Sequence, residues 1–398
     1  MKIRFLIANG YPAGGTIRTT ISNANALSAR GHDVEIISVL RRRTLPTFPI
    51  APDVRMRPLV DTSPAARDYS RWLEPFATKR HRLRTWLLEQ PSRLMHTSDV
   101  RYSTFNLYSD IQLLRFLRSV TDGVLIGTRP TLNLAIARFV RPSVIRIGQE
   151  HLHRDKHRPP LKASFMKYYP RLDAFATLTP GDAVAYQEML GHNARVVAMP
   201  NAAPDMGGVR ATLDNRIVIA AGRLTRQKGF DMLIPAFAQV AAKHPDWQLH
   251  IYGVGERQEE LEHKIAELEV GDHVKLLGFT KELPRKLAEA SIYALSSRFE
   301  GFPMVLLEAM MCGLPAVAFD CPTGPRDLID HGEDGLIVPF KDVDAMAAGI
   351  IELIEDEQRR KTFGARSYDK AQQYTTSGLA EQWEQLFVDI ARRRGITL

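Results

Sequence analysis

The sequence predicts an α/β protein built from two doubly wound, Rossmann-like domains in tandem. Short apolar runs alternate with longer amphipathic patterns throughout the 398 residues. Most of these runs are continuously apolar, which is typical of strands buried on both faces of a parallel sheet. A chain of this length suits two domains, and a Pro- and Gly-rich stretch at 200–208 interrupts the pattern near its middle.

The first half contains the strand candidates of one sheet and the first clear helical pattern. The helix is expected at 16–30. The strands are expected at 3–8, 34–39, 124–126, 144–147, 174–178 and 196–199. An alternation of this kind predicts a doubly wound domain.

The second half restarts the same alternation. Strands are expected at 217–221, 248–252, 274–277, 292–296, 316–319 and 336–338. Helices are expected at 230–243, 256–269, 282–290 and 342–355. A last helix at 379–393 has no strand after it, so it could finish the second domain or cross back onto the first.

A segment at about 66–120 contains no clear strand and breaks the rhythm of the first half. Apolar residues recur at helical spacing among many arginines, and prolines at 75 and 91 are expected to end or kink the helices. The stripe consists of Tyr69, Trp72, Leu73, Phe76, Leu83, Trp86 and Leu87. It predicts a basic helical insertion, either a cap with a solvated face or a contact with a membrane surface or anionic acceptor.

Composition excludes several classes of protein. Two cysteines, Cys312 and Cys321, rule out a disulfide scaffold and a Cys-rich zinc module. No run approaches 18 apolar residues, and the first ten residues suit a strand better than a signal peptide. We therefore expect a cytoplasmic protein.

Charge divides the chain into two unlike halves. Residues 1–200 contain 30 Lys and Arg against 15 Asp and Glu, whereas the rest of the chain is acidic in balance. The basic half predicts an anionic partner such as a nucleic acid, a membrane surface or a phosphate-rich substrate.

The strongest local motif runs from Ser297 to Pro315. A strand is expected to end near Ser296, a loop carries Glu300, and a helix is expected to begin near Met304 and to carry Glu308. The positive end of that helix suits a diphosphate, and the two carboxylates suit sugar hydroxyls. A plain helix start with surface acids is the alternative.

A second motif, at 221–231, follows the strand that opens the second domain. Arg223 and Lys228 place two cations at the carboxyl end of this strand, where open α/β sheets bind ligands. A basic turn that merely caps the next helix is the alternative interpretation.

Two further motifs lie at strand ends in the first half. Gly14 and Gly15 follow the first strand and open the first helix, without a dinucleotide fingerprint or a Walker lysine. Glu150, His151 and His153 follow the strand at 144–147. They could be a metal pair, an acid/base group, an orienting donor or structural residues, and the basic residues that follow disfavour a metal.

Two short patterns are better explained without a ligand. Asp342 and Asp344 match an Asp-x-Asp metal signature, but their place at a helix start favours N-capping. Gly253 and Gly255 form only half of a dinucleotide fingerprint.

Taken together, these motifs resemble the retaining glycosyltransferases of family 4, which have the GT-B architecture. The resemblance covers essentially the whole chain, most strongly residues 215–340. The stretch 319–325 is similar to a subset that acts on lipid-linked oligosaccharides or teichoic-acid-like polymers. The resemblance implies two Rossmann-like domains facing across a cleft, at 1–205 and 206–376, and a C-terminal helix at 377–398 that crosses back to the first.

The resemblance also implies roles for individual residues. Arg223 and Lys228 would hold the donor diphosphate, Glu300 the sugar hydroxyls and Glu308 the ribose. His151 would contact the sugar, although His153 is an alternative. The remaining donor-binding residues are Gly14, Gly15, Phe279, Gly301, Phe302, Pro303, Met304 and Val305. No metal and no cofactor are expected.

The expected activity is retaining transfer of a hexose or N-acetylhexosamine from a UDP-sugar to a cell-envelope glycan, lipid-linked or polyol-phosphate acceptor. The resemblance implies a front-face displacement with an oxocarbenium-like transition state. A sugar-nucleotide epimerase of the same architecture, or a polymer-binding protein without catalysis, are the alternatives. The expected partners are the nucleotide sugar and an anionic acceptor, with a possible contact at the inner face of the membrane and no nucleic acid.

Overall fold

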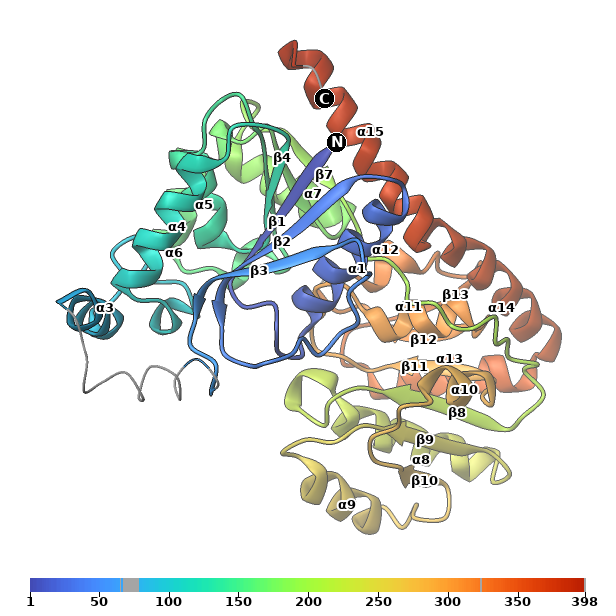
Figure 1. Ribbon diagram of the computed structural model, residues 1–398. Helices are drawn as coiled ribbons and strands as arrows, with labels where there is room; N and C mark the ends of the chain where they lie inside the picture. Colours follow the sequence, from blue (N-terminus) through green and yellow to red (C-terminus); the bar gives the residue numbers. More distant parts are fainter. Residues whose placement is uncertain (65, 67–78, 323, 397–398) are drawn as a thin grey trace. The chain divides into compact units, whose positions relative to one another are not determined.

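The computed structural model describes residues 1–64, 66, 79–322 and 324–396 and divides into two compact units (Figure 1). The first unit comprises Met1–Ala202 together with Thr376–Leu398, and the second comprises Ala203–Thr375. Each unit contains one parallel sheet, which confirms the predicted fold class of two Rossmann-like α/β domains.

The first unit contains a seven-stranded sheet in the order β3-β2-β1-β4-β5-β6-β7, and every neighbouring pair is parallel. The strands are β1 (Lys2–Ile7), β2 (Asp33–Arg41), β3 (Arg55–Asp61), β4 (Val124–Gly127), β5 (Ile145–Gln149), β6 (Ala174–Thr177) and β7 (Val196–Ala198). The strand order reverses between β1 and β4, as in a doubly wound fold.

The helices of the first unit cover both faces of this sheet. They are α1 (Gly15–Ala29), α3 (Lys79–Glu89), α4 (Leu107–Ser119), α5 (Pro130–Phe139), α6 (Pro159–Tyr168), α7 (Pro180–Leu190) and α15 (Thr376–Arg394). Alternate residues of β1 belong to different apolar clusters: Leu6 joins the cluster on the α4, α5, α6 and α7 side, and Phe5 the cluster on the α1 and α15 side. Side chains that alternate in this way point to opposite faces of the sheet.

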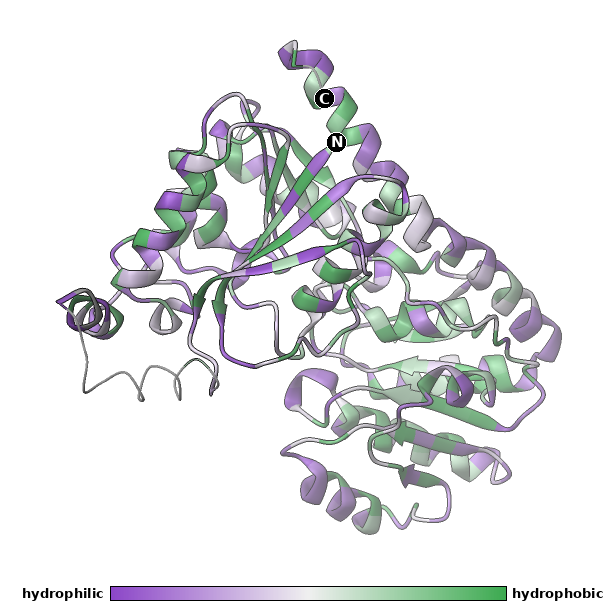
Figure 2. Ribbon diagram, in the orientation of Figure 1, coloured by the Kyte–Doolittle hydropathy of each residue, from purple (hydrophilic) through white to green (hydrophobic). Residues whose placement is uncertain are grey.

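The second unit contains a six-stranded parallel sheet in the order β10-β9-β8-β11-β12-β13. The strands are β8 (Ile217–Ala221), β9 (Gln248–Tyr252), β10 (Val274–Leu276), β11 (Ile292–Leu295), β12 (Ala316–Phe319) and β13 (Gly335–Val338). Figure 2 shows β8 and β12 as largely hydrophobic. Their residues are almost all buried, so the continuous apolar runs of the sequence are explained by burial on both faces.

The helices of the second unit follow the same pattern. They are α8 (Phe230–Lys243), α9 (Gln258–Glu267), α10 (Leu283–Ala288), α11 (Met304–Met311), α12 (Pro325–Leu328), α13 (Val343–Glu355) and α14 (Glu357–Ala371). Asp342 accepts a hydrogen bond from the Ala345 backbone at 2.9 Å and caps α13, as the sequence predicts. The side chain of Asp344 accepts a hydrogen bond from Gln239 at 2.7 Å.

The described part of the basic insertion contains the helices α3 and α4, joined by an irregular stretch with a short 3-10 turn at Tyr102–Thr104. Helix α3 exposes Leu83 and Trp86, with exposed fractions of 56% and 52%, while α4 buries Leu113 and Phe116 against the sheet. The first part of the predicted amphipathic stripe, Tyr69, Trp72, Leu73 and Phe76, lies outside the described residues. Among those that are described, no helix is both long enough and apolar enough to cross a bilayer.

Candidate functional site

Strand ends in the second unit bring together charged residues that are far apart in the sequence. Lys228 belongs to a short 3-10 turn after β8, and Glu300 follows β11. Lys228 Nζ lies 2.7 Å from Glu300 Oε1, and both side chains are largely buried. Adjacent parallel strands end at the same edge of the sheet, which explains how a pair 72 residues apart forms.

The backbone of both loops is fixed around this pair. Ser297 donates its hydroxyl to Glu300 Oε1 at 2.6 Å, and Ser296 donates to the carbonyl of Lys228 at 3.0 Å. Gly229 has φ +68, and a Cβ at this position would lie 2.0 Å from the carbonyl oxygen of Ser296. A side chain at 229 would therefore force a shift in the backbone where the loops of Lys228 and Glu300 meet.

An ion-pair network supports the same loops from outside. Arg298 forms a two-point contact with Asp231 at 2.7 and 2.8 Å, and Arg257 contacts the same carboxylate at 3.1 Å. Burial alone would raise the pKa of Asp231, but the hydrogen bond from Arg298 and the charges of both arginines outweigh burial and lower it. Asp231 thus stays ionised and links the start of α8 to the loop of Glu300.

Arg223 differs from Lys228 in having no internal partner. Its side chain is exposed, and no described residue forms a hydrogen bond or an ion pair with its guanidinium. An exposed guanidinium at a strand end can bind an anion in two-point fashion. The site therefore offers one cation held in place and one that is available.

Helix α11 begins beside this cluster and carries Glu308. Pro303 is the N-cap residue, and it has no side-chain oxygen to accept a hydrogen bond from the first N–H groups of the helix. Glu308 is buried, with an exposed fraction of 6%. The charges of Glu300 and Glu308 both act on the buried Tyr293 hydroxyl, whose pKa is raised well above its usual value, mainly by burial. The structure thus brings both predicted carboxylates to the same end of β11.

Phe279 lies on a turn after β10 and is 70% exposed. The backbone of the preceding residue, Gly278, accepts a hydrogen bond from Gly253 at 2.8 Å, which ties this turn to the end of β9. The turn is therefore fixed, while its aromatic side chain is open to solvent.

Cys312 and Cys321 are buried thiols in the second unit. Burial raises the pKa of each to about 12, with Glu308 adding to the effect at Cys312 and Glu300 at Cys321. A thiol with so high a pKa is a poor nucleophile. These residues are best explained as packing beside the carboxylates.

In the first unit, His151 lies half-buried in the loop that follows β5. Burial lowers its pKa to about 4, so the imidazole is neutral at physiological pH. Glu150 accepts a hydrogen bond from the His151 backbone at 2.9 Å and lies 3.4 Å from His157 Nε2. His151 Nε2 is covered and has no hydrogen-bond partner among the described residues, which leaves a polar atom for water or a ligand.

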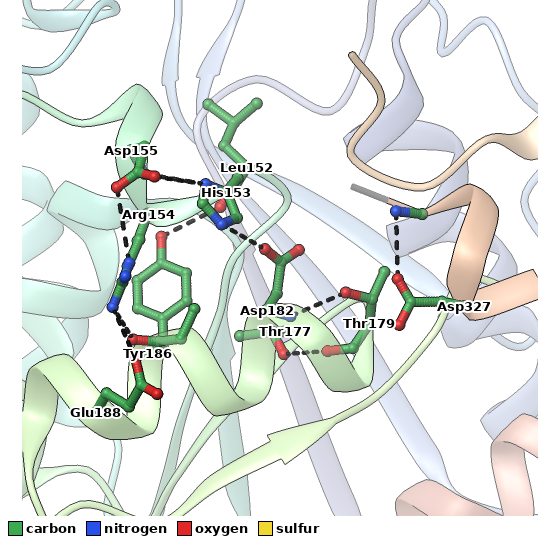
Figure 3. A network of polar contacts seen from close by, with 12 residues as sticks. Leu152, His153, Arg154, Asp155, Thr177, Thr179, Asp182, Tyr186, Glu188 and Asp327 are labelled. Atoms are coloured by element: carbon green, nitrogen blue, oxygen red, sulfur yellow. Dashed lines mark hydrogen bonds and ion pairs between the residues drawn. The ribbon is translucent and has the colours of Figure 1, made fainter. Parts of the chain in front are cut away.

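His153, the alternative histidine, belongs to a different network (Figure 3). Its Nε2 lies 3.7 Å from Asp182 and its Nδ1 lies 3.5 Å from Asp155. Tyr186 donates to the carbonyl of Leu152 at 3.1 Å, and this bond fixes the loop between the two histidines. His153 therefore holds the loop in place by contacts with two carboxylates, whereas His151 keeps an atom available.

Gly14 and Gly15 line a cavity of about 210 Å³ in the first unit. Gly14 is the N-cap of α1 and offers no side chain to the first N–H groups of this helix. Three arginines that the sequence analysis did not single out, Arg42, Arg101 and Arg129, line the same cavity. Arg42 and Arg129 each lie three residues after a predicted strand, at 34–39 and at 124–126, whereas Arg101 had no such signal.

Among the described residues, no group of three or more His, Cys, Asp or Glu side chains is arranged to hold a metal ion. The sequence reasoning did not single out Arg42, Arg101 or Arg129, and it named Ser297 without its hydrogen bond to Glu300.

Comparison with known proteins shows similarity to glycosyltransferases. The family described as "Glycosyl transferases group 1" matches residues 207–370. An exopolysaccharide phosphotransferase of Streptomyces coelicolor is 36% identical over 397 residues, which cover 99% of this chain but 41% of that protein. An uncharacterized glycosyltransferase of Haemophilus influenzae is 29% identical over 386 residues, 96% of this chain and 99% of the relative.

The fold has close structural relatives too. The crystal structure of HepE from Anabaena in complex with UDP matches with a TM-score of 0.73 and 18% identity, over 98% of this chain and 100% of that one. This likeness shows a shared GT-B fold. Over residues 207–370 the chain is similar to the glycosyl transferases group 1 family, and over nearly its whole length it has the GT-B fold.

Proposed function

We propose that this chain transfers a hexose or an N-acetylhexosamine from a UDP-sugar, with retention of configuration, to a phosphate-bearing glycan or lipid-linked acceptor of the cell envelope. The observation that carries the donor assignment is the Lys228–Glu300 pair beside the exposed Arg223. The similarity of residues 207–370 to the glycosyl transferases group 1 family favours transfer over epimerisation. The UDP bound by HepE agrees with a UDP-sugar donor.

The chemistry requires positive charge at the departing diphosphate. Lys228, held by Glu300, and Arg223 supply two cations, and the uncapped N–H groups of α11 add a partial positive charge. Lys228 and the start of α11 are fixed before the reaction, so they stabilise the leaving group without reorganisation, and the exposed Arg223 can add a two-point contact. Glu300 and Glu308 are acceptors for sugar and ribose hydroxyls.

His151 is proposed to contact the donor sugar. A neutral imidazole can donate or accept a hydrogen bond without adding charge to a transition state that is itself positive at the sugar. The nucleophile is the acceptor hydroxyl, and its proton goes to the leaving diphosphate. This step retains configuration when both groups occupy one face of the sugar.

We assign the acceptor-binding site to the first unit and the nucleotide-binding site to the second. Helix α15 is part of the first unit and packs against α1. We propose a peripheral membrane contact through α3, whose exposed Leu83 and Trp86 lie beside the exposed cations Lys79 and Arg82. Apolar side chains flanked by cations suit an anionic bilayer surface.

The test is a mass-spectrometric screen of UDP-hexoses and UDP-N-acetylhexosamines, with and without phosphorylated acceptors. The parent should release UDP and form a product, and Lys228→Gln should be slower by about 10²–10³. Lys243→Gln, at the far end of α8, is the matched control. An isomerised sugar nucleotide without UDP release would favour an epimerase, and unchanged turnover in folded Lys228→Gln would remove the donor assignment.

A further inference from the structure

We propose that the cavity in the first unit binds a phosphate group of the acceptor through Arg42, Arg101 and Arg129. That the bound phosphate belongs to the acceptor rests on the proposed function, whereas the cavity and its charges are independent of that function. The described residues that line the cavity include these three arginines and no aspartate or glutamate. A cavity with only positive formal charges on its wall favours an anion.

The position of the cavity is where a ligand is expected in this fold. Ile7 ends β1 and Ala8 follows it, Leu40 belongs to β2, and Arg129 follows β4. The strand order reverses between β1 and β4 (Figure 1), so the cavity lies at the topological switch point of the sheet. Ligands of open α/β sheets bind at the carboxyl ends of the strands at this point.

Two of the arginines are held in place by the protein. Arg42 donates to the carbonyl of Thr104 at 3.0 Å, and Arg129 contacts Asp99 at 3.1 Å. Asp99 is buried and also accepts the backbone N–H of Arg101 at 2.8 Å and the hydroxyl of Thr131 at 2.9 Å. One buried carboxylate therefore positions both Arg129 and the loop of Arg101, and it balances only one of the three cations.

Arg101 is the cavity arginine whose guanidinium is most available to bind a ligand. No described residue forms a hydrogen bond or an ion pair with its guanidinium, and its side chain is exposed. Guanidinium groups bind phosphate oxygens in two-point fashion. The first N–H groups of α1 line the same cavity at Gly15 and Thr16, and they add partial positive charge.

Size and charge indicate an acceptor phosphate rather than the whole donor. Pockets for drug-sized ligands have volumes of about 300–1,000 Å³, and this cavity of about 210 Å³ suits a smaller group. The proposed donor diphosphate already meets Arg223 and Lys228 in the second unit. Three more arginines are thus available for a second anion, which agrees with the basic balance of the first 200 residues.

The experiment is calorimetry on the full chain at low and high salt, with inorganic phosphate, glycerol phosphate, a short isoprenyl diphosphate and uncharged glycerol as probes. The parent should bind the phosphorylated probes, more weakly at high salt, and should not bind glycerol. Glycerol phosphate and isoprenyl diphosphate separate a polyol-phosphate source from a lipid-linked one. Arg101→Gln should weaken phosphate binding about tenfold, the scale of one charge-assisted hydrogen bond.

Arg141→Gln is the matched control, since it removes an exposed arginine that follows α5 at the opposite end of the strands. Arg42→Gln should also weaken phosphate binding. Arg101→Gln is the more decisive variant, because the Arg101 guanidinium forms no hydrogen bond with any described residue. If Arg101→Gln binds phosphate as tightly as Arg141→Gln, or if the parent binds none of the anions at low salt, the site is wrong. A separate titration of the parent with UDP tests the proposed function, so either idea can fail alone.

Discussion

Glu300 and Glu308 follow the same strand and meet different surroundings. Glu300 is fixed by Lys228 and Ser297 in the loop after β11, whereas Glu308 is on α11, one turn past its first residues. The proposed roles differ in the same way, with Glu300 toward the sugar and Glu308 toward the ribose.

Glu300→Gln is expected to slow transfer by about 10²–10³, because it alters the group that faces the sugar, while UDP binding changes little, because the amide oxygen can still accept a hydrogen bond from Lys228. Glu308→Gln is expected to weaken UDP binding about tenfold, since a hydrogen bond to a charged group is lost. Calorimetry with UDP and with UDP-sugar measures both. UDP binding as tight in Glu308→Gln as in the parent would reassign this residue.

His151 is expected to titrate with a midpoint near pH 4, because burial disfavours its charged form. The pKa lies below the usual 6.5, so the ring should stay neutral as the pH falls from 8 to 5. NMR of the imidazole C–H signals, assigned with His151→Gln, measures the midpoint. A midpoint near 6.5 would show that the ring is solvated and would weaken its proposed role in a water-poor site.

At the scale of elements, one strand was not predicted from the sequence. β3 (Arg55–Asp61) contains Pro58 and three charged residues, Arg55, Arg57 and Asp61, so its apolar residues form no continuous run in the sequence. Proline is tolerated because β3 is the edge strand, with only β2 as a neighbour. The buried strands were predicted within one or two residues, because their apolar runs are set by burial on both faces.

Helix α3 is expected to bind anionic vesicles weakly and reversibly. Trp86→Ser should reduce cosedimentation with anionic vesicles at low salt several-fold, because it removes an exposed aromatic ring beside basic residues. High salt should reduce binding by the parent as well. Met166→Ser, which removes an exposed apolar side chain from α6, is the control. Equal sedimentation of parent and Trp86→Ser would leave α3 as a solvated cap.

The contact between α1 and α15 should make stability depend on pH. Glu384 accepts hydrogen bonds from Arg30 at 2.7 and 2.9 Å and contacts His32 at 2.7 Å. The hydrogen bond from Arg30 is the main cause that lowers the pKa of Glu384 to about 2. A lowered carboxylate pKa stabilises the fold above the unfolded value of about 4.3 and is lost as the pH falls toward 2.

Chemical denaturation at pH 6 and pH 3 measures this effect. The unfolding free energy of the parent should fall more than that of Glu384→Gln, by on the order of 1–2 kcal/mol after allowing for solvent screening. Glu381→Gln, on the same helix, is the control. An identical pH dependence in parent and Glu384→Gln would mean that the contact contributes nothing to stability.

At the scale of the molecule, turnover is expected to persist in a chelator. Arg223, Lys228 and the start of α11 supply the positive charge that a divalent ion supplies elsewhere, and Asp342 is engaged as a helix cap. Activity with EDTA, compared with activity after adding Mg²⁺ or Mn²⁺, measures this. Loss in chelator and recovery with metal would require another source of charge stabilisation.

The sequence predicted where strands end but not which distant residues come into contact there. The carboxyl ends of strands could be located from apolar runs, so Arg223, Lys228, Glu300 and His151 were found as candidates. The pairing of Lys228 with Glu300 depends on which strands are neighbours, and no local pattern reports that. Arg42 and Arg101 lie in loops without periodicity, and only the fold brings them to Arg129.

The connectivity of the two units has a consequence for biosynthesis. The apolar cluster of the first unit includes Trp383 and Phe387 of α15. About 170 residues of the second unit are translated before these two residues. At roughly 5–20 residues per second, about 10–30 s pass between synthesis of the sheet of the first unit and synthesis of its last helix. The second unit is continuous in the chain, and the Ala203 N–H donates to the Tyr374 carbonyl at 2.8 Å across its two ends. The unit that is translated second can therefore finish folding first, and a chaperone would meet the nascent first sheet with its α15 face uncovered.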